Sequence, residues 1–203
     1  MKGLYLVTPD WDDTEQLVAV SEAALRGGAA LLQYRHKTAS PQLRREQAAR
    51  LQALCRQYRV PFIINDFVDL CLELDADGIH VGGTDMGIAQ TRASVGPGKI
   101  VGASCYGSMD LARAAHGAGA SYVAFGGFYP SRVKKYEVTT PPAIVAEAKR
   151  TLPLPVVVIG GMTAENARPL VEQGTDMVAA ISSVYMADDP EHAARAFGSL
   201  FPG

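Results

Sequence analysis

Short apolar runs rich in Val, Ile and Leu alternate along the chain with longer segments whose apolar residues recur at helical spacing. The short runs predict strands, which lie at residues 4–8, 31–35, 62–65, 78–81, 99–104, 122–126, 155–161 and 177–182. The longer segments predict helices, which lie at residues 14–28, 41–59, 67–75, 86–96, 108–119, 142–151, 163–174 and 190–201. Strict alternation predicts a parallel sheet, and eight such units favour closure into a (β/α)8 barrel.

The predicted architecture is one compact (β/α)8 TIM barrel domain over residues 1–203. A chain of 203 residues lies near the lower end of the range of about 200 to 400 residues for this fold, so most loops must be short. The alternative is an open doubly wound sheet, which usually has a Gly-rich phosphate turn after its first strand. Pro9 and Asp10 occupy that turn here, which favours the barrel.

Capping residues mark several of the predicted helix ends. Thr14 is expected to cap the first helix and Gly27 to end it. Ser40 is expected to cap the second helix, with Pro41 at its first position. Thr163 is expected to cap the helix at 163–174.

Composition and charge narrow the class of protein. The chain is 48% hydrophobic and carries a net charge of −2, so neither a nucleic acid nor an anionic membrane is indicated as a partner. The cysteines, Cys55, Cys71 and Cys105, are scattered without a CxxC pair, which favours reduced thiols. The apolar run at residues 1–10 is too short for a signal peptide, and no stretch approaches the length of a membrane span, so we expect neither. We therefore expect a cytoplasmic protein that acts on small molecules.

Residues 62–86 contain the carboxylates on which the functional interpretation depends. Asn65 and Asp66 follow one predicted strand, and a Gly-Gly turn after the next strand delivers Asp85. If these strands are parallel neighbours, both carboxylates reach one mouth of the barrel, where paired carboxylates suit Mg²⁺. The alternative is that each residue caps the following helix. Two acidic caps in succession, next to a basic strand end, favour the metal.

Basic side chains lie at the end of the second predicted strand. Gln33, Arg35 and Lys37 alternate, so an extended continuation of the strand places all three on one side. Two cations and an amide there could hold a polyphosphate and the edge of a heterocycle. The alternative is a solvated basic edge, which the neighbouring carboxylates make the weaker interpretation.

Three further strand ends offer hydroxyl or backbone N–H groups. Ser104 ends the fifth strand, either as a ligand contact or as a turn hydroxyl. Gly160 and Gly161 follow the seventh strand, and Ile181 and Ser182 the eighth. Barrels of this kind commonly bind phosphate at these two strand ends. A tight turn before a capped helix is the alternative for the glycines.

The loop at 127–139 is the long exception among the short connections. It carries Ser131, Lys134 and Lys135. Charges in a loop are usually only solvated, but the length and position of this loop favour a lid that closes over substrate.

The histidines suggest no catalytic arrangement. His80 lies inside a predicted strand and is expected to line or pack the barrel without a catalytic role. His36, His116 and His192 are expected at the surface. No Ser-His-Asp or Cys-His arrangement is supported by position, and the sparse aromatic residues provide no stacking platform for nucleic acid.

Together these residues predict two anion sites at one mouth. One combines Mg²⁺ with basic side chains and suits a diphosphate, and the other is a backbone cradle for a phosphate. Two phosphorylated substrates, one of them a diphosphate, suggest a transferase with pyrophosphate as the leaving group. Metal and lysine would stabilise the charge that develops on the leaving oxygens.

The chain also resembles a known family, thiamin-phosphate synthase (thiamin-phosphate pyrophosphorylase), over nearly its whole length. The carrying motifs, in order, are LYLVTP, LLQYRHK, FIINDFVD, ADGIHVGGTDM, VGAS, YVAFGGFYPSRVKK, VVVIGGMTAEN and MVAAISSVYMADDP. The resemblance implies a (β/α)8 barrel that joins hydroxymethylpyrimidine diphosphate to thiazole phosphate with Mg²⁺. It implies a dissociative mechanism, in which pyrophosphate leaves before the thiazole nitrogen attacks the pyrimidine methylene.

The resemblance assigns roles position by position. The metal ligands would be Asp66 and Asp85. The catalytic residues would be Lys134, which assists departure of pyrophosphate, Arg35 and Ser104. The substrate-binding positions would be Gln33, Tyr34, Arg35, His36, Lys37, Asn65, Ser104, Ser131, Arg132, Val133, Lys134, Gly161, Ile181 and Ser182.

The chain departs from the family pattern in three places. The loop usually reads Thr-x-Thr-Lys-Lys, but here Val133 stands where a hydroxyl is usual. A lost hydrogen bond of about 0.5–1.5 kcal/mol would weaken binding of the thiazole phosphate unless backbone N–H groups suffice. His36 stands where an acidic residue is common, and because inward residues flank it we expect it to point away with little effect. The stretch VTTPPA lacks a glycine often found after the loop.

Three alternative functions stay open. The sister family of thiazole tautomerases, which are isomerases, typically lacks the Asn-Asp pair and carries a histidine after the fifth strand. A non-catalytic homologue that binds thiamin precursors would be favoured by loss of the metal pair or the lysine. A sugar-phosphate isomerase would explain the phosphate cradle but not the diphosphate half. A homo-oligomer is compatible with all of them.

Overall fold

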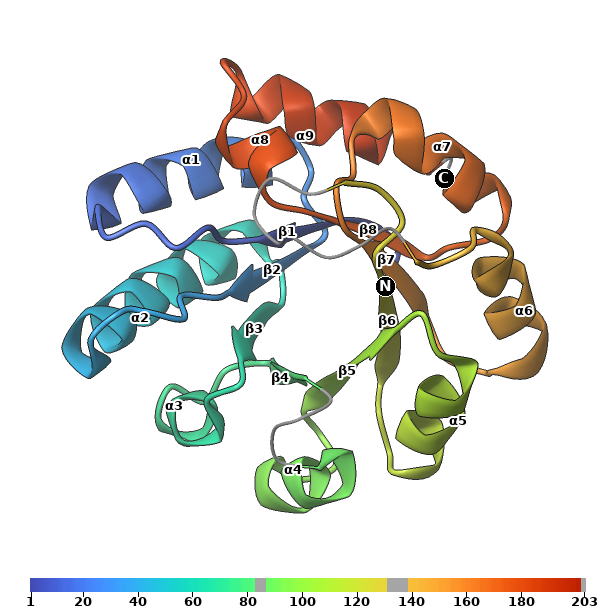
Figure 1. Cartoon of the computed structure of the whole chain (residues 1–203). Coiled ribbons are helices and arrows are strands. Elements are labelled where there is room, and N and C mark those ends of the chain that lie inside the picture. Colours follow the sequence, from blue (N-terminus) through green and yellow to red (C-terminus); the bar gives the residue numbers. More distant parts are fainter. Residues whose placement is uncertain (83–86, 131–138, 202–203) are drawn as a thin grey trace.

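The strands form a closed parallel barrel in sequence order, β1 to β8, with β8 paired to β1 (Figure 1). The computed structural model describes residues 1–82, 87–130 and 139–201 of the chain. The strands are β1 Gly3–Val7, β2 Leu31–Tyr34, β3 Phe62–Asn65, β4 Gly78–Val81, β5 Ile100–Tyr106, β6 Tyr122–Gly126, β7 Val156–Ile159 and β8 Met177–Ala180. The predicted (β/α)8 barrel is therefore confirmed, and the open doubly wound sheet is wrong.

Helices surround the barrel and cover the outer face of the strands (Figure 1). They are α1 Thr14–Arg26, α2 Pro41–Tyr58, α3 Val68–Glu73, α4 Ile88–Val95, α5 Met109–Gly117, α6 Ala143–Thr151, α7 Ala164–Glu172, α8 Ser182–Tyr185 and α9 Pro190–Gly198. The last helix, α9, packs against α1 and β1, so the two ends of the described chain meet on one side of the ring. None of the described helices is long and apolar enough to cross a membrane.

The core has two layers separated by the strands. Alternate residues of each strand point into the barrel or out toward the helices, so that Tyr5 faces inward and Leu4 and Leu6 face outward. The inner layer consists of Tyr5, Val7, Leu31, Ile63, Tyr122, Ala124, Val157, Met177 and Ala179. Because both faces are buried, the strands read as nearly continuous apolar runs, as is typical of parallel sheets.

Several predicted element ends need correction. The cap of α1 is Asp13, whose carboxylate accepts from the Gln16 N–H at 2.9 Å, and not Thr14, which is the first helical residue. The cap of α4 is Gly87, so this helix begins at residue 88 rather than 86. The caps predicted at Ser40 and Thr163 are confirmed, because each hydroxyl accepts a backbone N–H three residues ahead.

The ends of the last two strands also differ from the prediction. β7 stops at Ile159, and Gly160 and Gly161 leave it with φ angles of 113° and 63°. β8 stops at Ala180, and the short helix α8, absent from the prediction, begins directly afterwards. Residues that seemed to extend these strands therefore form the turns at the mouth of the barrel.

Candidate active site

Two basic residues beyond β2 are held by one carboxylate that the sequence interpretation missed. The Arg35 Nη1 atom donates to both carboxylate oxygens of Asp10, at 3.2 and 3.3 Å. The backbone N–H of Lys37 donates to the same carboxylate at 3.0 Å. From the sequence, Asp10 was interpreted only as a residue that follows the first strand. Its position there, next to the basic end of the second strand, could have indicated that it pairs with Arg35 and Lys37.

Asp66 follows β3 in a backbone conformation that is unusual for a residue other than glycine. Its φ is 64°, in the left-handed region that Asp and Asn tolerate better than most residues. The Asn65 Nδ2 atom donates to Asp66 Oδ2 at 2.6 Å, and the Lys37 Nζ atom lies 3.7 Å from the same oxygen. The structure thus brings Lys37, Asn65 and Asp66 together, as the sequence predicted.

Asp66 does not cap the following helix. The cap position of α3 is Phe67, which makes no side-chain capping bond. The backbone N–H of Asp66 donates to the His80 carbonyl at 2.9 Å, which ties the residue to β4. The capping alternative is therefore wrong for Asp66, and its carboxylate is turned toward the basic strand end instead.

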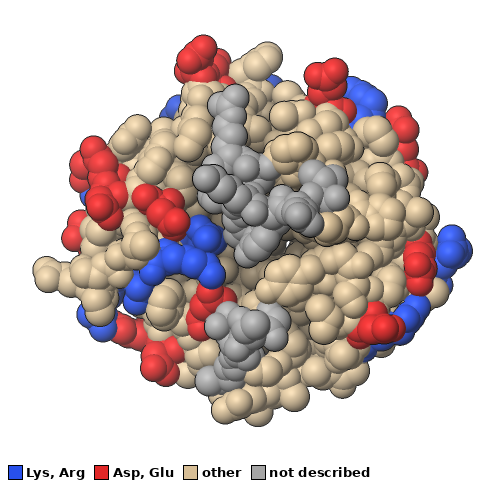
Figure 2. Space-filling view, in the orientation of Figure 1, with Lys and Arg blue, Asp and Glu red and all other residues tan. Residues whose placement is uncertain are grey.

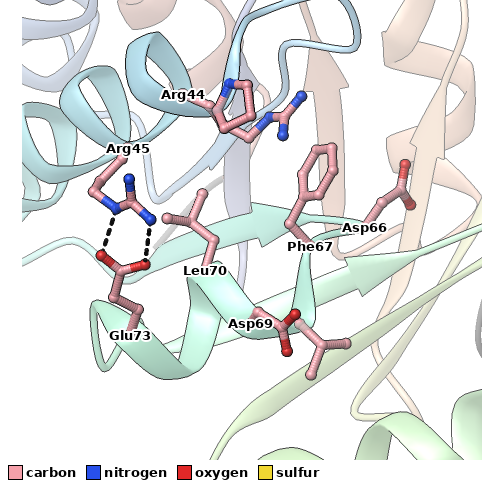
Figure 3. A pocket seen from close by; sticks show the side chains of 9 residues that line it. Arg44, Arg45, Asp66, Phe67, Asp69, Leu70 and Glu73 are labelled. Carbon is pink, nitrogen blue, oxygen red and sulfur yellow. Dashed lines mark hydrogen bonds and ion pairs between the residues drawn. The ribbon is translucent and has the colours of Figure 1, made fainter.

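A cavity of about 350 Å³ lies beside Asp66, between α2 and α3. Figure 3 shows the Arg44 guanidinium above the Phe67 ring, with the Asp66 carboxylate turned away from the ion pair between Arg45 and Glu73. The Arg44 Cζ atom lies 3.6 Å from the centre of that ring, within the range of a cation–π contact. This contact holds the side chain that follows Asp66 in sequence and so restrains the turn.

The Asp66 carboxylate fits the ligand that Mg²⁺ prefers. It is a hard oxygen donor, its side chain is 22% exposed, and Lys37 already provides a cation beside it. Mg²⁺ commonly takes one or two carboxylates and completes its shell with substrate phosphate and water. The second predicted ligand, Asp85, lies outside the described residues, and among the described residues no three His, Cys, Asp or Glu side chains form a metal-binding group.

Ser104 was predicted to end the fifth strand, but β5 continues to Tyr106, and the Ser104 side chain is joined to the interior of the barrel. Its Oγ lies 2.9 Å from His80 Nε2, and His80 Nδ1 lies 2.9 Å from the Tyr122 hydroxyl. The Tyr122 hydroxyl lies 2.6 Å from the Tyr5 hydroxyl, which accepts from Gln33 Nε2 at 2.6 Å. His80 lines the barrel as expected, but sequence analysis gave no sign that it connects two predicted site residues, Gln33 and Ser104.

Two other predicted substrate-binding positions point away from this interior chain. Tyr34 faces α2, where its hydroxyl donates to Gln47 Oε1 at 2.9 Å. His36 is buried rather than at the surface, which corrects the prediction. Its Nε2 lies 3.0 Å from an Asp12 carboxylate oxygen, and its Nδ1 accepts from the Ala39 N–H at 3.1 Å. His116 and His192 are exposed, as predicted.

The end of β7 is shaped by backbone contacts and carries no charge. A Cβ atom on Gly161 would lie 2.3 Å from the Pro130 carbonyl oxygen, so this position has room only for glycine. The Gly161 carbonyl accepts from Asn166 Nδ2 at 2.9 Å, and Asn166 also completes a capping box with Thr163. These bonds fix the turn before α7.

The end of β8 is also free of charged side chains. Ile181 occupies the cap position of α8, and Ser182 is the first residue of that helix. Both are half-buried. The described residues at the ends of β7 and β8 therefore offer backbone groups and a hydroxyl rather than fixed charges.

Only the two ends of the long loop after β6 are described. The N–H groups of Thr139 and Thr140 donate to the Gly127 carbonyl at 3.2 and 3.3 Å, which brings the two ends together. Thr140 Oγ1 also donates to the Gly126 carbonyl at 2.5 Å. The predicted site residues of the loop, Ser131, Arg132, Val133 and Lys134, lie outside the described residues.

The buried thiols have the properties of packing residues rather than nucleophiles. Burial raises the pKa of Cys105, next to Ser104, to about 12. Burial likewise raises the pKa of Cys55 to about 12 and that of Cys71 to about 11. At neutral pH all three stay protonated, and a thiol is a poor nucleophile in that state.

Figure 2 shows how differently the two sides of this face are charged. On the side where β2 and β3 lie in Figure 1, blue and red atoms lie together beside the centre. On the opposite side the described surface beside the centre is tan. Among the described residues, the candidate active site thus has a charged side at β2–β3 and a side without charged side chains at β7–β8.

Comparisons with known proteins agree with one another. A family model described as "Thiamine monophosphate synthase" matches residues 4–184. The thiamine-phosphate synthase of Janthinobacterium sp. (strain Marseille) is 67% identical over 201 residues, covering 99% of this chain and 97% of that protein. The thiamine-phosphate synthase of Thiobacillus denitrificans is 49% identical over 199 residues, covering 98% of this chain and 94% of that protein.

Solved structures show the same likeness. A thiamine phosphate pyrophosphorylase from Pyrococcus furiosus superimposes with a TM-score of 0.85 at 32% identity, covering 98% of this chain and 94% of that one. A 3-hexulose-6-phosphate synthase superimposes with a TM-score of 0.74 at 17% identity and covers all of both chains. The second likeness concerns the barrel fold alone.

Proposed function

The chain belongs to the thiamine monophosphate synthase family, and on that premise we propose that this enzyme makes thiamin phosphate from two phosphorylated precursors. One precursor is 4-amino-2-methyl-5-hydroxymethylpyrimidine diphosphate and the other is thiazole phosphate. The bond between the pyrimidine methylene and the diphosphate oxygen breaks, and pyrophosphate leaves with the bonding electrons. The thiazole nitrogen then attacks the methylene carbon, which gives thiamin phosphate.

The charged side of the mouth is proposed to hold the diphosphate. Arg35 and Lys37 supply cations for its oxygens, and Asn65 and Gln33 supply amide groups beside the pyrimidine. Asp66, with Asp85, would hold Mg²⁺, which when bound would neutralise charge on the diphosphate. Lys134 would donate to the leaving oxygens as their charge develops.

The β7–β8 side is proposed to hold the thiazole phosphate. Gly161, Ile181 and Ser182 offer backbone N–H groups at the ends of β7 and β8, and residues 131–133 are proposed to complete the site. Separating the two anions in this way reduces the repulsion between them before reaction. It also leaves the thiazole nitrogen facing the pyrimidine methylene rather than the diphosphate.

The observation that carries this proposal is the orientation of Asp66. Its carboxylate leaves the helix-cap position and lies 3.7 Å from Lys37 Nζ, next to Asn65. A carboxylate kept beside Lys37, just beyond β2, suits a metal–diphosphate site, which the sister isomerases would not need. The tautomerases typically carry a histidine after the fifth strand, whereas here Cys105 and Tyr106 follow Ser104. This difference also favours the synthase over the tautomerase.

The direct test incubates the purified protein with both precursors and Mg²⁺ and measures thiamin phosphate and pyrophosphate. We expect the two products in equal amounts and neither product when EDTA replaces Mg²⁺. Absence of thiamin phosphate from the complete mixture would sink the synthase proposal. Isomerisation of the thiazole without pyrimidine would favour the tautomerase, and binding of both precursors without turnover would favour the non-catalytic homologue.

A further inference from the structure

A continuous chain of hydrogen bonds crosses the interior of the barrel beneath the mouth. It runs from Gln33 through Tyr5, Tyr122 and His80 to Ser104, and each step is 2.6 to 2.9 Å long. These residues come from five different strands, β2, β1, β6, β4 and β5. We propose that Tyr5, Tyr122 and His80 are positioning residues that fix which of the two end groups donates a hydrogen bond to substrate and which accepts one.

The two tyrosines can each pass on only one hydrogen. Both are fully buried, and burial raises the pKa of Tyr5 and Tyr122 well above the ordinary value, so both stay protonated. A phenol has one O–H to donate. Because Tyr5 accepts from Gln33 Nε2, its own hydrogen goes to Tyr122, and the Tyr122 hydrogen goes to His80 Nδ1.

The direction of the chain determines the tautomer of His80. A neutral imidazole that accepts at Nδ1 carries its hydrogen on Nε2. His80 Nε2 therefore donates to Ser104 Oγ, 2.9 Å away. Because Ser104 accepts this bond, its own hydroxyl hydrogen points elsewhere, toward the mouth, and Ser104 acts there as a donor.

The opposite end of the chain presents the complementary group. With Nε2 engaged by Tyr5, Gln33 presents Oε1, which is an acceptor, to the mouth. A ligand that matches this pair has one N–H donor and one ring-nitrogen acceptor, and an aminopyrimidine has both. This step rests on the proposed function, whereas the direction of the chain does not.

For a neutral His80, the alternative arrangement of the same atoms is the reversed chain of hydrogen bonds. In that arrangement Gln33 Oε1 accepts from Tyr5, His80 carries its hydrogen on Nδ1, and Ser104 donates to His80. The mouth would then meet an acceptor at Ser104 and a donor at Gln33. Buried hydrogen-bond networks of this kind hold their members in one arrangement because an unpaired member would be costly.

A glycine makes room for the middle of the chain. A Cβ atom on Gly102 would lie 2.1 Å from Tyr122 Cζ and 2.6 Å from His80 Nδ1. The rings of His80 and Tyr122 instead stack across this position, with centroids 5.6 Å apart and planes 20° apart. The barrel is thus shaped to accommodate this polar pair, which generic apolar packing would not require.

The first test measures the tautomer of His80 without using the enzyme activity. The chain has four histidines, so ¹⁵N-histidine labelling gives a simple NMR spectrum, and His80→Gln assigns the His80 signals. We expect Nε2 protonated and Nδ1 unprotonated, and we expect Tyr122→Phe to weaken this preference. A protonated Nδ1 in the unaltered protein, or no change in Tyr122→Phe, would overturn the proposed direction.

The second test compares two amide replacements of His80. Gln can place an N–H near the former Nε2 and reach Ser104, whereas Asn can replace only Nδ1. We expect His80→Gln to keep kcat within about threefold of the unaltered enzyme and His80→Asn to lower it about tenfold, since Asn leaves Ser104 without its partner. In a Ser104→Ala background the two variants should have equal kcat.

A matched control and the possible negative results separate the positioning role of His80 from the proposed synthase function. Tyr185→Phe removes another buried hydroxyl, which lies 2.7 Å from Ser21 Oγ and is not one of the groups joined between Gln33 and Ser104, and it should leave kcat unchanged. Equal kcat for the Gln and Asn variants when Ser104 is present, or a difference that persists without Ser104, would show that His80 does not act through Ser104. If the unaltered protein makes no thiamin phosphate, the proposed function is wrong. The NMR result still decides the direction of the hydrogen bonds from Gln33 to Ser104, which we call the interior relay.

Discussion

We propose that the two sides of the mouth recognise anions by different means. The β2–β3 side uses charged side chains, and in the structure these are already paired, Arg35 with Asp10 and Lys37 with Asp66. The β7–β8 side uses backbone turns, which Gly161 and its bond to Asn166 hold in place. The charges of the first side would have to change partners if an anion bound there, whereas the described turns of the second side are held by backbone contacts.

This difference teaches how two similar ligands can be kept apart. A charged side chain attracts any anion over a distance set by salt screening, about 8 Å at physiological ionic strength. A backbone cradle discriminates by shape, because its N–H groups satisfy only an anion that fits. We therefore expect changes on the two sides to affect different substrates, and the predictions below test that separation.

The largest effect is expected from removing the charge of Asp66. Asp66→Asn keeps the shape of the side chain but loses the carboxylate proposed to hold the metal, and we expect kcat/KM for the pyrimidine diphosphate to fall about 10²- to 10³-fold. The KM for thiazole phosphate should change less than about threefold, since the opposite side is untouched. Steady-state kinetics with each substrate varied in turn measures both values.

A control in the same segment makes this result specific. Asp69→Asn changes an exposed carboxylate in the first turn of α3, on the outer cavity beside Asp66. This variant should keep unaltered kinetics and unaltered thermal stability. Equal losses in both variants would mean that the effect comes from the local charge and not from a ligand role of Asp66.

The second effect is expected on the backbone side, from Gly161→Ala. The added Cβ meets the Pro130 carbonyl at 2.3 Å, and the φ of 63° is unfavourable for alanine. We expect a loss of about 1–3 kcal/mol in the free energy of unfolding and a raised KM for thiazole phosphate. The KM for the pyrimidine diphosphate should stay nearly constant, and urea unfolding and kinetics measure the two consequences.

Gly28→Ala is the matched control for backbone strain. Gly28 also has a positive φ, of 94°, but a Cβ there meets nothing within 4 Å. This variant should lose about 1–2 kcal/mol of stability from the strained backbone alone and should show no change in either KM. If Gly28→Ala raised the KM for thiazole phosphate as much as Gly161→Ala, the cradle at β7 would have no specific role.

The charged side and the barrel could be predicted from the sequence because both depend on local pattern. Strand and helix periodicity predicts the order of units, and charges directly after strands predict which mouth they occupy. Lys37, Asn65 and Asp66 indeed meet there. The capping alternative for Asp66 could not be rejected from sequence, because it depends on one backbone angle.

The interior relay could not be predicted, because it depends on register between distant strands. His80 lies opposite Asn65 and Gly102 in the ladders, and Gly102 lies opposite Tyr122. Nothing local in GIHV or YVAFG indicates that the two rings meet. The prediction that His36 lies at the surface was wrong for a related reason. Its burial follows from contacts with Asp12 and Ala39, which its polar neighbours in sequence do not suggest.

The smallest effect of a substitution concerns the buried tyrosines beneath both sides of the mouth. It is an effect on stability, and it is expected at alkaline pH. Tyr5 and Tyr122 stay protonated in the folded protein because burial raises their pKa, whereas in the unfolded chain a tyrosine ionises at about pH 10. Below pH 10 their contribution to stability is fully present. Above it the unfolded state releases protons that the folded state keeps, so stability falls as pH rises toward the folded-state pKa values.

Each buried tyrosine should lower the free energy of unfolding by about 1.4 kcal/mol for every pH unit above about 10. The buried thiols, with folded-state pKa values of about 11 to 12, should begin to contribute from about pH 8.5. Urea unfolding between pH 8 and 11 measures the slope of the free energy of unfolding against pH.

Tyr122→Phe should make this slope above pH 10 shallower by the contribution of one tyrosine. Tyr106→Phe, which alters an exposed side chain, should leave the slope unchanged. An unaltered slope in Tyr122→Phe would mean that the phenol ionises without unfolding the barrel, and the relay would then lack the fixed hydrogens on which its direction depends.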